Sequence, residues 1–391
     1  MHAMTIKTIE HLGIPEPDLL ASGAIWTARE IEQQPRMLQQ THALITGMRE
    51  QIEAFTAPIT GNANARIILT GAGSSSYIGQ CLAPLLDHRL AARVDSVPTT
   101  DLVSAPYLYL DPAQPLLLVS FGRSGNSPES LAAVKLAESL VKDVRHLVVT
   151  CNAEGALSTI PARKIMTLLL PEETHDTSFA MTSSFSCMLY ATLVALGDAH
   201  AMDNRITPIA LATGHVIKET RLSLQELALH GFDRVVYLGS GLFQGLAREA
   251  ALKLGELTNG AVATCFDSPL GFRHGPKTFI TDRTLVMVFV SNDPLTRRYD
   301  HDLLDELRQD GCAARIIEVT ARQRQPQAPD TLLVPGMEAA DDIDLLWAYL
   351  AIVQIYAFNA SRAMGLSPDS PNKQGTVNRV VQGVRIHSTT P

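Results

Sequence analysis

The sequence has few cysteines and no pattern that would pair them. No C-x-x-C motif occurs, so neither a disulfide framework nor a redox-active cysteine motif is indicated. The five cysteines are scattered along the chain at Cys81, Cys151, Cys187, Cys265 and Cys312. Unpaired cysteines in mostly apolar surroundings are typical of a reduced compartment, so we expect a cytoplasmic protein.

Basic residues and long apolar runs are also scarce. Lys and Arg number 32 against 40 Asp and Glu, which gives a net charge of −8. This balance argues against a nucleic acid or an anionic membrane as the main partner. No run reaches the ~18 apolar residues of a membrane span. The opening MHAMTIKTIEHLG lacks the apolar segment of a signal peptide.

Metal-binding motifs are missing as well. The chain contains no H-E-x-x-H and no Cys/His cluster at ligand spacing, so we expect no metal and no cofactor. At 391 residues, with 46% hydrophobic and 18% charged residues, the chain is long enough for about two folded domains.

The order of apolar patterns predicts an α/β fold. Residues 1–55 have helical spacing, and Pro35 is expected to break this segment into two helices. From Arg66 onward, strands and helices alternate, which predicts a parallel sheet covered by helices on both faces. The predicted strands lie near 66–70, 93–97, 116–120, 146–150 and 165–170, and the helices near 76–90, 128–141 and 183–196.

The second half of the chain restates the first. DRVVYLGSGLFQGLAREAALKL repeats the strand, G-x-G loop and helix of IILTGAGSSSYIGQCLAPLL, and LVMVFVSNDP repeats LLLVSFGRSGNSP. We interpret this as an internal duplication of one three-layer α/β/α unit. The predicted parts are an N-terminal helical segment at 1–55, a first unit at 56–200, and a second unit with a C-terminal tail at 201–391.

The stretch LLLVSFGRSGNSPESLAAVKLAESL reads as a strand, a small polar loop and a helix. Ser127 takes the N-cap position and Pro128 the first helical position. Gly122, Ser124 and Ser127 offer hydroxyls and unhindered N–H groups at a helix start, which can bind an anion, and Arg123 adds charge. The same residues are equally compatible with an ordinary capped helix.

A second loop of this kind favours binding of a phosphate. In RIILTGAGSSSYIGQCLAPLL, three serines follow G-A-G, and the third glycine falls at Gly79, out of register with a dinucleotide fingerprint. Two serine-rich loops in one sheet suit a phosphorylated sugar. A third cluster, with Thr182 and Ser183, begins a later helix, where sugar contact and helix capping are both open.

The second unit offers different chemistry. Asp293 replaces the serines of the first unit's loop and would repel a phosphate. In the helix expected at 245–259, Glu249, Lys253 and Glu256 share one face, which suits either a proton-transfer site or a solvated stripe of ion pairs. His274 lies in the loop that follows. A carboxylate and a histidine together are the groups that aldose–ketose proton transfer uses.

Taken together, these motifs resemble a known family. The ordered set G-x-G-S-S, S-G-N-S, A-L-K-L-x-E-L and R-H-G-P is similar to the double SIS (sugar isomerase) family, which includes the isomerase half of glucosamine-6-phosphate synthase. SFGRSGNSPES, SFAMTSSFS, FRHGPK and SPDSPNKQGTVNRVVQGV resemble the tagatose-6-phosphate ketose/aldose isomerase group, regarded as galactosamine-6-phosphate deaminase/isomerases. The likeness extends over nearly the whole chain from about Thr27.

The resemblance implies roles for residues of the first unit and of the tail. Ser75, Ser124 and Ser127 would bind the phosphorylated sugar, with Gly122 and Arg123 in the same loop. The synthases carry a lysine near the sugar in a C-terminal loop. Here the matching position is Thr376, and Lys373 is close but out of register.

The resemblance also implies the catalytic groups. Glu256 matches the carboxylate that moves the proton, Lys253 the lysine one turn before it, and His274 the ring-opening histidine. In relatives this histidine reaches into a neighbouring subunit's site, which implies a homodimer or a homotetramer.

The predicted reaction converts galactosamine-6-phosphate to tagatose-6-phosphate and ammonia. It would proceed through ring opening, C2-to-C1 proton transfer by way of an enolamine, and ketimine hydrolysis. Simple aldose–ketose isomerisation of a hexose 6-phosphate and fructosamine-6-phosphate deglycation would use the same proton shuttle. A non-catalytic regulator that binds a sugar phosphate is the alternative outside the enzymes.

Overall fold

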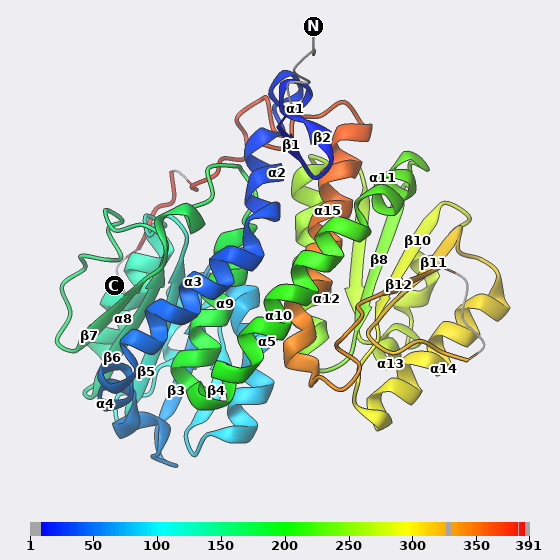
Figure 1. The fold of residues 1–391 in the computed structure, drawn as a ribbon. Coiled ribbons are helices and arrows are strands. Elements are labelled where there is room, and N and C mark those ends of the chain that lie inside the picture. The colour runs from blue at the N-terminus through cyan, green and yellow to red at the C-terminus, as the bar shows by residue number, and fades with distance from the viewer. Residues whose placement is uncertain (1–8, 326–329, 382, 388–391) are drawn as a thin grey trace, which may run out of the picture.

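The computed structural model describes residues 9–325, 330–381 and 383–387. The start of the chain, where no signal peptide is expected, lies largely outside these ranges. Two five-stranded parallel sheets stand side by side, and helices lie between and around them (Figure 1). The predicted α/β class with two tandem units is confirmed.

The two sheets have the same strand order relative to the chain. In each, the second strand of the unit forms one edge, the first strand is its neighbour, and the third, fourth and fifth strands follow. In space, the first sheet runs β4 (Arg93–Ser96), β3 (Arg66–Thr70), β5 (Leu116–Gly122), β6 (Val144–Thr150) and β7 (Ile165–Leu169). The second runs β9 (Ala263–Asp267), β8 (Arg234–Gly239), β10 (Thr284–Phe289), β11 (Arg315–Thr320) and β12 (Thr331–Leu333). This shared order confirms the predicted duplication.

Helices precede, connect and follow the strands. The N-terminal ones follow a short hairpin of β1 (Glu10–His11) and β2 (Ile14–Pro15). They are α1 (Glu16–Ser22), α2 (Ile25–Glu32), α3 (Gln34–Gly47) and α4 (Arg49–Thr60). Pro35 lies in the first turn of α3, so the predicted break falls just before it.

The helices of the first unit are α5 (Ser74–Arg89), α6 (Thr99–Ser104), α7 (Pro106–Tyr109), α8 (Pro128–Leu140), the 3-10 turn η1 (Glu172–Thr174) and α9 (Ser183–Leu196). Two helices, α10 (Ala199–Glu219) and α11 (Arg221–Leu229), connect the units. The second unit has α12 (Leu242–Leu257), α13 (Pro269–Phe272), the 3-10 turn η2 (Pro276–Phe279), α14 (Pro294–Asp310) and α15 (Asp342–Ala363).

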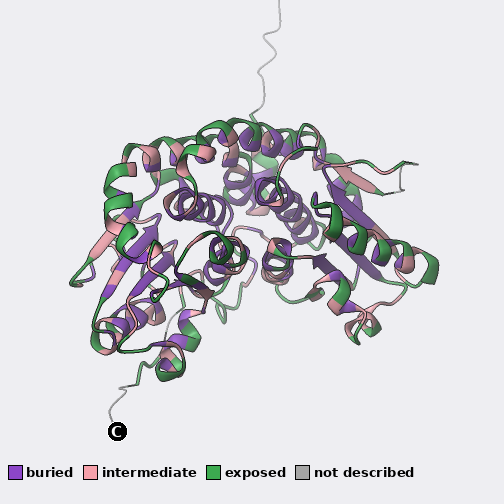
Figure 2. Cartoon of the chain, turned by 90° about the horizontal axis from the view of Figure 1, so that it is seen from below, coloured by how far each residue is buried: buried purple, intermediate pink, exposed green. Residues whose placement is uncertain are grey.

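The helices between the two sheets form the centre of the molecule. Seen from below, they and the strands are largely buried, while the outer helices expose one face (Figure 2). Here α12 packs against α5 of the first unit and against α15. Among the described residues, α15 alone is long and apolar enough to cross a membrane, but its apolar window is entirely buried, as expected for a core helix. This packing brings α12 to the loops of the first sheet.

Candidate functional site

A pocket opens where β3 and β5 end side by side. These two strands are neighbours in the sheet. After β3 the chain returns through α5 to β4 on one side, and after β5 it returns through α8 to β6 on the other side. Ligands of open α/β sheets bind at such a switch point, outside the carboxyl ends of the strands. The pocket is lined by the loops after both strands, by Phe179 and Met181, by Glu256 of α12, and by residues 377–381 of the tail.

The loop after β5 presents small polar groups to this pocket. Ser127 is the N-cap of α8, and Pro128 follows at the first helical position, as predicted. The Ser127 hydroxyl donates to Glu129 Oε2 at 2.7 Å and does not cap the helix, which leaves the N–H groups of the first turn without a side-chain cap. An amino end of this kind attracts an anion.

The same loop is held in shape from the next strand connection. Gly125 has a φ of +66°, and a side chain there would meet Gly155 at 3.3 Å, so the position requires glycine. Asn152 Nδ2 donates to the Ser124 carbonyl at 2.8 Å, and the Leu157 N–H donates to the Gly125 carbonyl at 2.8 Å. The conformation of this loop is therefore fixed by the protein itself.

The loop after β3 brings serines to the opposite wall. Ser74 and Ser75 begin α5, line the pocket and are buried. Ser75 Oγ contacts Met181 Sδ at 3.5 Å, and Ser74 Oγ donates to Glu249 Oε1 at 3.1 Å. The expected convergence of both serine-rich loops is what the structure has.

Glu256 lies in the pocket wall with a buried lysine behind it. Its side chain is 26% exposed, and its Oε2 is 3.0 Å from Lys253 Nζ. Lys253 is fully buried and also contacts Glu249 Oε1 at 3.3 Å and Ser74 Oγ at 3.2 Å. The helix face is therefore no solvated stripe, because both Glu249 and Lys253 are inaccessible. A polar network joins the second unit's helix to the first unit's serine loop.

Burial changes the acid–base properties of this network. Burial, and to a lesser degree the charge of Glu256, raises the pKa of Glu249 to about 7 against the opposing effect of Lys253. Burial acts to lower the pKa of Lys253, but the two carboxylates together raise it above its ordinary value. Glu249 Oε2 is buried and has no hydrogen-bond partner in the described part of the chain. Such a carboxyl changes charge near neutral pH.

Arg123 lies in the pocket wall, as expected from the sequence, and it also has a structural task. It lines the pocket, but its Nη1 donates to the carbonyls of Ser178 and Phe179, at 3.2 and 2.9 Å. Its Nη2 donates to the Arg379 carbonyl at 3.0 Å. Burial lowers the pKa of Arg123 to about 10, with a further contribution from Arg379. Arg123 therefore holds the tail against the pocket by a hydrogen bond. Its positive charge contributes to the electrostatic potential in the pocket.

Three other predicted contact residues lie elsewhere. Thr182 and Ser183 do not line the pocket; the Thr182 N–H donates to Asp176 Oδ2 at 2.7 Å and Ser183 Oγ to Asp176 Oδ1 at 2.5 Å. Thr182 does not cap α9 with its own side chain either; the carboxylate of Asp176 accepts from the N–H groups of Thr182 and Ser184 at the start of this helix. Lys373 is exposed and is not among the lining residues.

His274 is also outside the pocket of its own chain. It is exposed in the loop between α13 and η2, on the second unit. No residue of that loop lines the pocket formed by the first unit, α12 and the tail. Within one chain, Glu256 and His274 therefore do not meet.

The corresponding loop of the second unit is filled by its own carboxylates. Asp342 accepts from Ser291 Oγ at 2.5 Å and from the Asn292 N–H at 2.6 Å. Asp300 accepts from the Ser291 N–H at 2.9 Å. Asp293 caps α14. The donors that would hold an anion are already used, which agrees with the prediction that this unit does not bind the phosphate.

The tail and two side chains were missed by the sequence reasoning. Residues 377–381, Phe179 and Met181 all line the pocket. The sequence contains no local signal for them, because the tail returns to the first unit only through the packing of α15. The stretch SPDSPNKQGTVNRVVQGV contains the tail residues that line the pocket, but Lys373 in the same stretch does not line it.

The chain is similar to known proteins in both sequence and structure. The SIS domain family model matches residues 62–196. The D-galactosamine-6-phosphate deaminase AgaS of Escherichia coli is 45% identical over 378 residues, which cover 95% of this chain and 97% of the relative. The protein of the same name from Shewanella sp. strain ANA-3 is 43% identical, with 93% and 92% covered. The solved tagatose-6-phosphate ketose/aldose isomerase from Escherichia coli has a TM-score of 0.87 at 42% identity, covering 94% of this chain and 97% of that one.

Proposed function

The chain belongs to the AgaS family of SIS-domain proteins, and on this premise we propose that it converts galactosamine-6-phosphate to tagatose-6-phosphate and ammonia. One observation carries the proposal: the carboxylate of Glu256 faces a pocket whose other walls are two serine-rich, anion-binding loops. This places a proton-transferring group opposite the place where a phosphate would be held. A cytoplasmic location is part of the proposal, since all five cysteines are free thiols.

Binding begins with the phosphate. The hydroxyls of Ser75, Ser124 and Ser127 and the first N–H groups of α8 receive it, and the Arg123 charge adds attraction. Because the loops are held rigid by backbone hydrogen bonds, the sugar carbons are fixed relative to Glu256.

The chemistry starts with ring opening. His274 moves the proton of the C1 hydroxyl toward the ring oxygen, so that the C1–O5 bond breaks and a C1 aldehyde forms. Glu256 then takes the proton from C2. The C2–H electrons form a C1=C2 double bond, the π electrons of the C1 carbonyl move to its oxygen, and this oxygen takes a proton from water, which gives the enolamine.

Proton return and hydrolysis complete the reaction. Glu256 gives its proton to C1, so the double bond shifts to C2=N and a ketimine forms. Water adds to C2, and the C–N bond breaks with release of ammonia and formation of the ketone. The product is tagatose-6-phosphate.

Lys253 acts from behind the pocket wall. It does not line the pocket, but its ammonium group lies 3.0 Å from Glu256 Oε2 and fixes that carboxylate. In this low-dielectric position its positive charge favours the developing oxyanion electrostatically. Glu249 and Ser74 hold the ammonium group in turn.

A second copy of the chain supplies the histidine in this proposal. His274 is exposed and away from its own pocket, as the family resemblance leads one to expect of a residue that serves a neighbour. The smallest active unit is then a homodimer, which a homotetramer would contain twice.

A second candidate is favoured by one comparison. The Escherichia coli protein of solved structure bears the name of a ketose/aldose isomerase. With oxygen in place of nitrogen at C2, the same proton transfer by Glu256 gives isomerisation with no hydrolysis. Product analysis with each sugar separates the two.

Replacing Glu256 tests the proposed mechanism. Glu256→Gln keeps the size of the side chain but removes the base, so ammonia release should fall by about 10²–10⁴-fold while sugar phosphate binding is retained. Calorimetry measures the binding, and a coupled ammonia assay the turnover. Turnover near the wild-type rate would remove Glu256 from the mechanism.

Mixing two inactive variants tests the shared site in the same preparation. Glu256→Gln and His274→Ala chains, refolded or exchanged together, should regain about a quarter of wild-type activity, because half of the dimers are mixed and one of their two sites is intact. If the mixture stays inactive while exchange of subunits is demonstrated, His274 does not act across the interface.

A further inference from the structure

A second polar cleft lies on the other side of α5 and α12. Arg248 is the one charged residue among the described residues that line it, and Gln80, Ser96 and Gln244 add neutral polar groups. The cleft shares no lining residue with the pocket that contains Glu256.

The guanidinium group of Arg248 is held between two aromatic rings. Its central carbon lies 5.1 Å from the centroid of the Tyr77 ring and 5.2 Å from that of the Phe266 ring. These cation–π contacts fix the plane of the group without using its N–H donors. Tyr77 comes from the first unit and Phe266 from the second.

Three polar side chains of the cleft have unused donors. Within the described ranges, the side chains of Arg248, Gln80 and Gln244 form no hydrogen bond, whereas Ser96 Oγ donates to the Ser76 carbonyl at 3.4 Å. No nitrogen of the Arg248 side chain is both buried and without a hydrogen-bond partner. Its unused N–H donors are therefore accessible. An arginine fork with five free N–H groups fits a carboxylate or a phosphate.

The cleft is preformed by close packing of two helices. A side chain at Gly245 of α12 would lie 2.7 Å from the backbone nitrogen of Cys81 in α5, so glycine permits this approach. Gln80 of α5 and Gln244 of α12 both line the cleft. Gly241, just before the start of α12, also lines it and has open space beside it. The positive end of the helix dipole adds to the charge of Arg248.

We infer that this cleft is a second oxyanion site, in which Arg248, stacked between Tyr77 and Phe266, binds the phosphate or carboxylate group of a small molecule. The site is separate from the proposed catalytic pocket and does not depend on its chemistry. Two glutamine side chains next to the guanidinium group can donate to the other oxygens of the anion.

Tungstate, a tetrahedral oxyanion with a strong X-ray signal, is the first probe. Crystals of the full chain soaked in tungstate should show one anion at the Ser124 loop and one at Arg248. Arg248→Gln should lose only the second. Because Arg248 forms no ion pair or hydrogen bond within the described residues, this variant is expected to fold normally.

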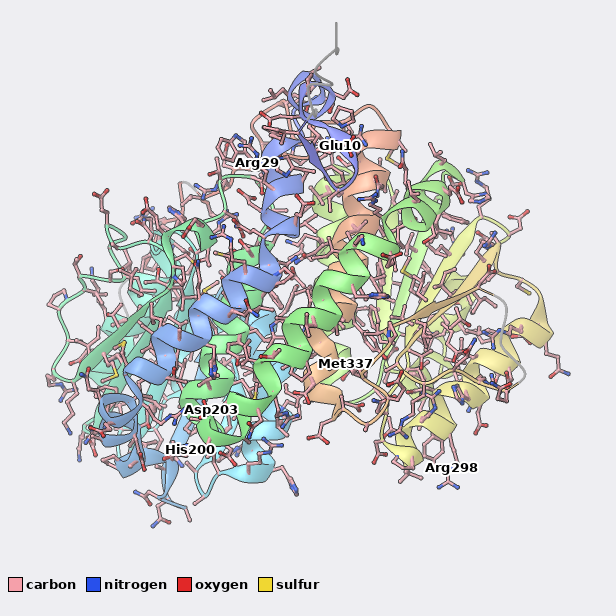
Figure 3. All side chains as sticks on the ribbon, in the orientation of Figure 1. Glu10, Arg29, His200, Asp203, Arg298 and Met337 are labelled. Carbon is pink, nitrogen blue, oxygen red and sulfur yellow. The ribbon has the colours of Figure 1, made fainter. Side chains whose placement is uncertain are left out.

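Arg298→Gln is the matched control. Arg298 is exposed on α14 and points away from the molecule at its edge (Figure 3), so its replacement should keep both anions. An empty Arg248 cleft beside an occupied Ser124 loop would overturn the inference and leave the proposed function intact. So would coverage of the cleft by a second copy of the chain. An empty Ser124 loop would count against the proposed function alone.

Solution binding checks the inference at ordinary concentrations. Inorganic phosphate and malonate are titrated separately by calorimetry into the full chain, in which the Ser124 loop and the Arg248 cleft are the two expected anion sites. Arg248→Gln should weaken one of the two binding steps by about tenfold or more, as expected for loss of a charge-assisted hydrogen-bond pair, and should leave the other unchanged. Phosphate or malonate binding supports the site and identifies which anion it prefers. Equal affinity with and without Arg248 would contradict it.

Discussion

At the scale of single residues, the proposed chemistry depends on the buried network of Glu249, Lys253 and Ser74. The ammonium group of Lys253 is inaccessible, and its charge is maintained by two carboxylates on the same helix. The arrangement makes the charge of Lys253 depend on Glu249, which itself changes protonation at about pH 7. The pH dependence of turnover should reveal this coupling.

Glu249→Gln should shift the alkaline limit of kcat/KM. Burial lowers the pKa of Lys253, and the charge of Glu249 raises it. Without the Glu249 charge, the pKa of Lys253 should therefore fall. Activity should then decline at a lower alkaline pH than in the wild type. Below about pH 7, where wild-type Glu249 is protonated, the two profiles should converge. Full pH–rate profiles are the measurement.

A matched charge removal provides the control. Glu226 is exposed on α11, and Glu226→Gln should leave the profile unchanged. If Glu249→Gln also leaves the alkaline limit in place, Lys253 does not need its positive charge in the reaction.

Residue types and spacing predicted much of this site, but not the direction of each side chain. Ser75, Ser124 and Glu256 lie in one pocket as expected. Thr182 and Ser183 look equally suitable in the sequence, yet the Thr182 N–H and the Ser183 hydroxyl both donate to Asp176. The difference depends on a buried carboxylate six residues before Thr182, and sequence alone does not tell whether a serine cluster faces a ligand or a neighbouring side chain.

At the scale of elements, the contact between α5 and α12 determines whether the site forms. The repeat of strand, loop and helix was visible in the sequence, because the same small residues recur at the same places. The sequence did not indicate which other helix each of these helices packs against. Gly245 and Gly255 both lie inside α12, but only Gly245 closely approaches another helix.

Alanine substitutions at these two glycines should have opposite effects. Gly245→Ala places a methyl group 2.7 Å from the Cys81 nitrogen, so it should lower the free energy of unfolding by about 1–3 kcal/mol. Gly255→Ala meets no atom within 4 Å and should raise it by up to about 1 kcal/mol, because alanine is the better helix former. Urea denaturation measures both. Equal effects would show that the close helix contact does not form.

At the scale of the whole molecule, the pocket is assembled from parts that are far apart in the sequence. The first unit contributes the two serine-rich loops, the second contributes Glu256, and the tail forms one wall through its contact with Arg123. The sequence predicted two similar units with different tasks. It could not place the tail, because that segment has no repeat and no strong periodicity, and its position follows from α15.

Ammonia release from galactosamine-6-phosphate by the purified full chain tests the central claim most directly. Glucosamine-6-phosphate and tagatose-6-phosphate are assayed alongside, with a chelator present. The account predicts ammonia and tagatose-6-phosphate in equal amounts from the galacto sugar, and loss of both with Glu256→Gln. Binding of the galacto sugar without release of ammonia, under conditions where the protein is folded, would contradict it.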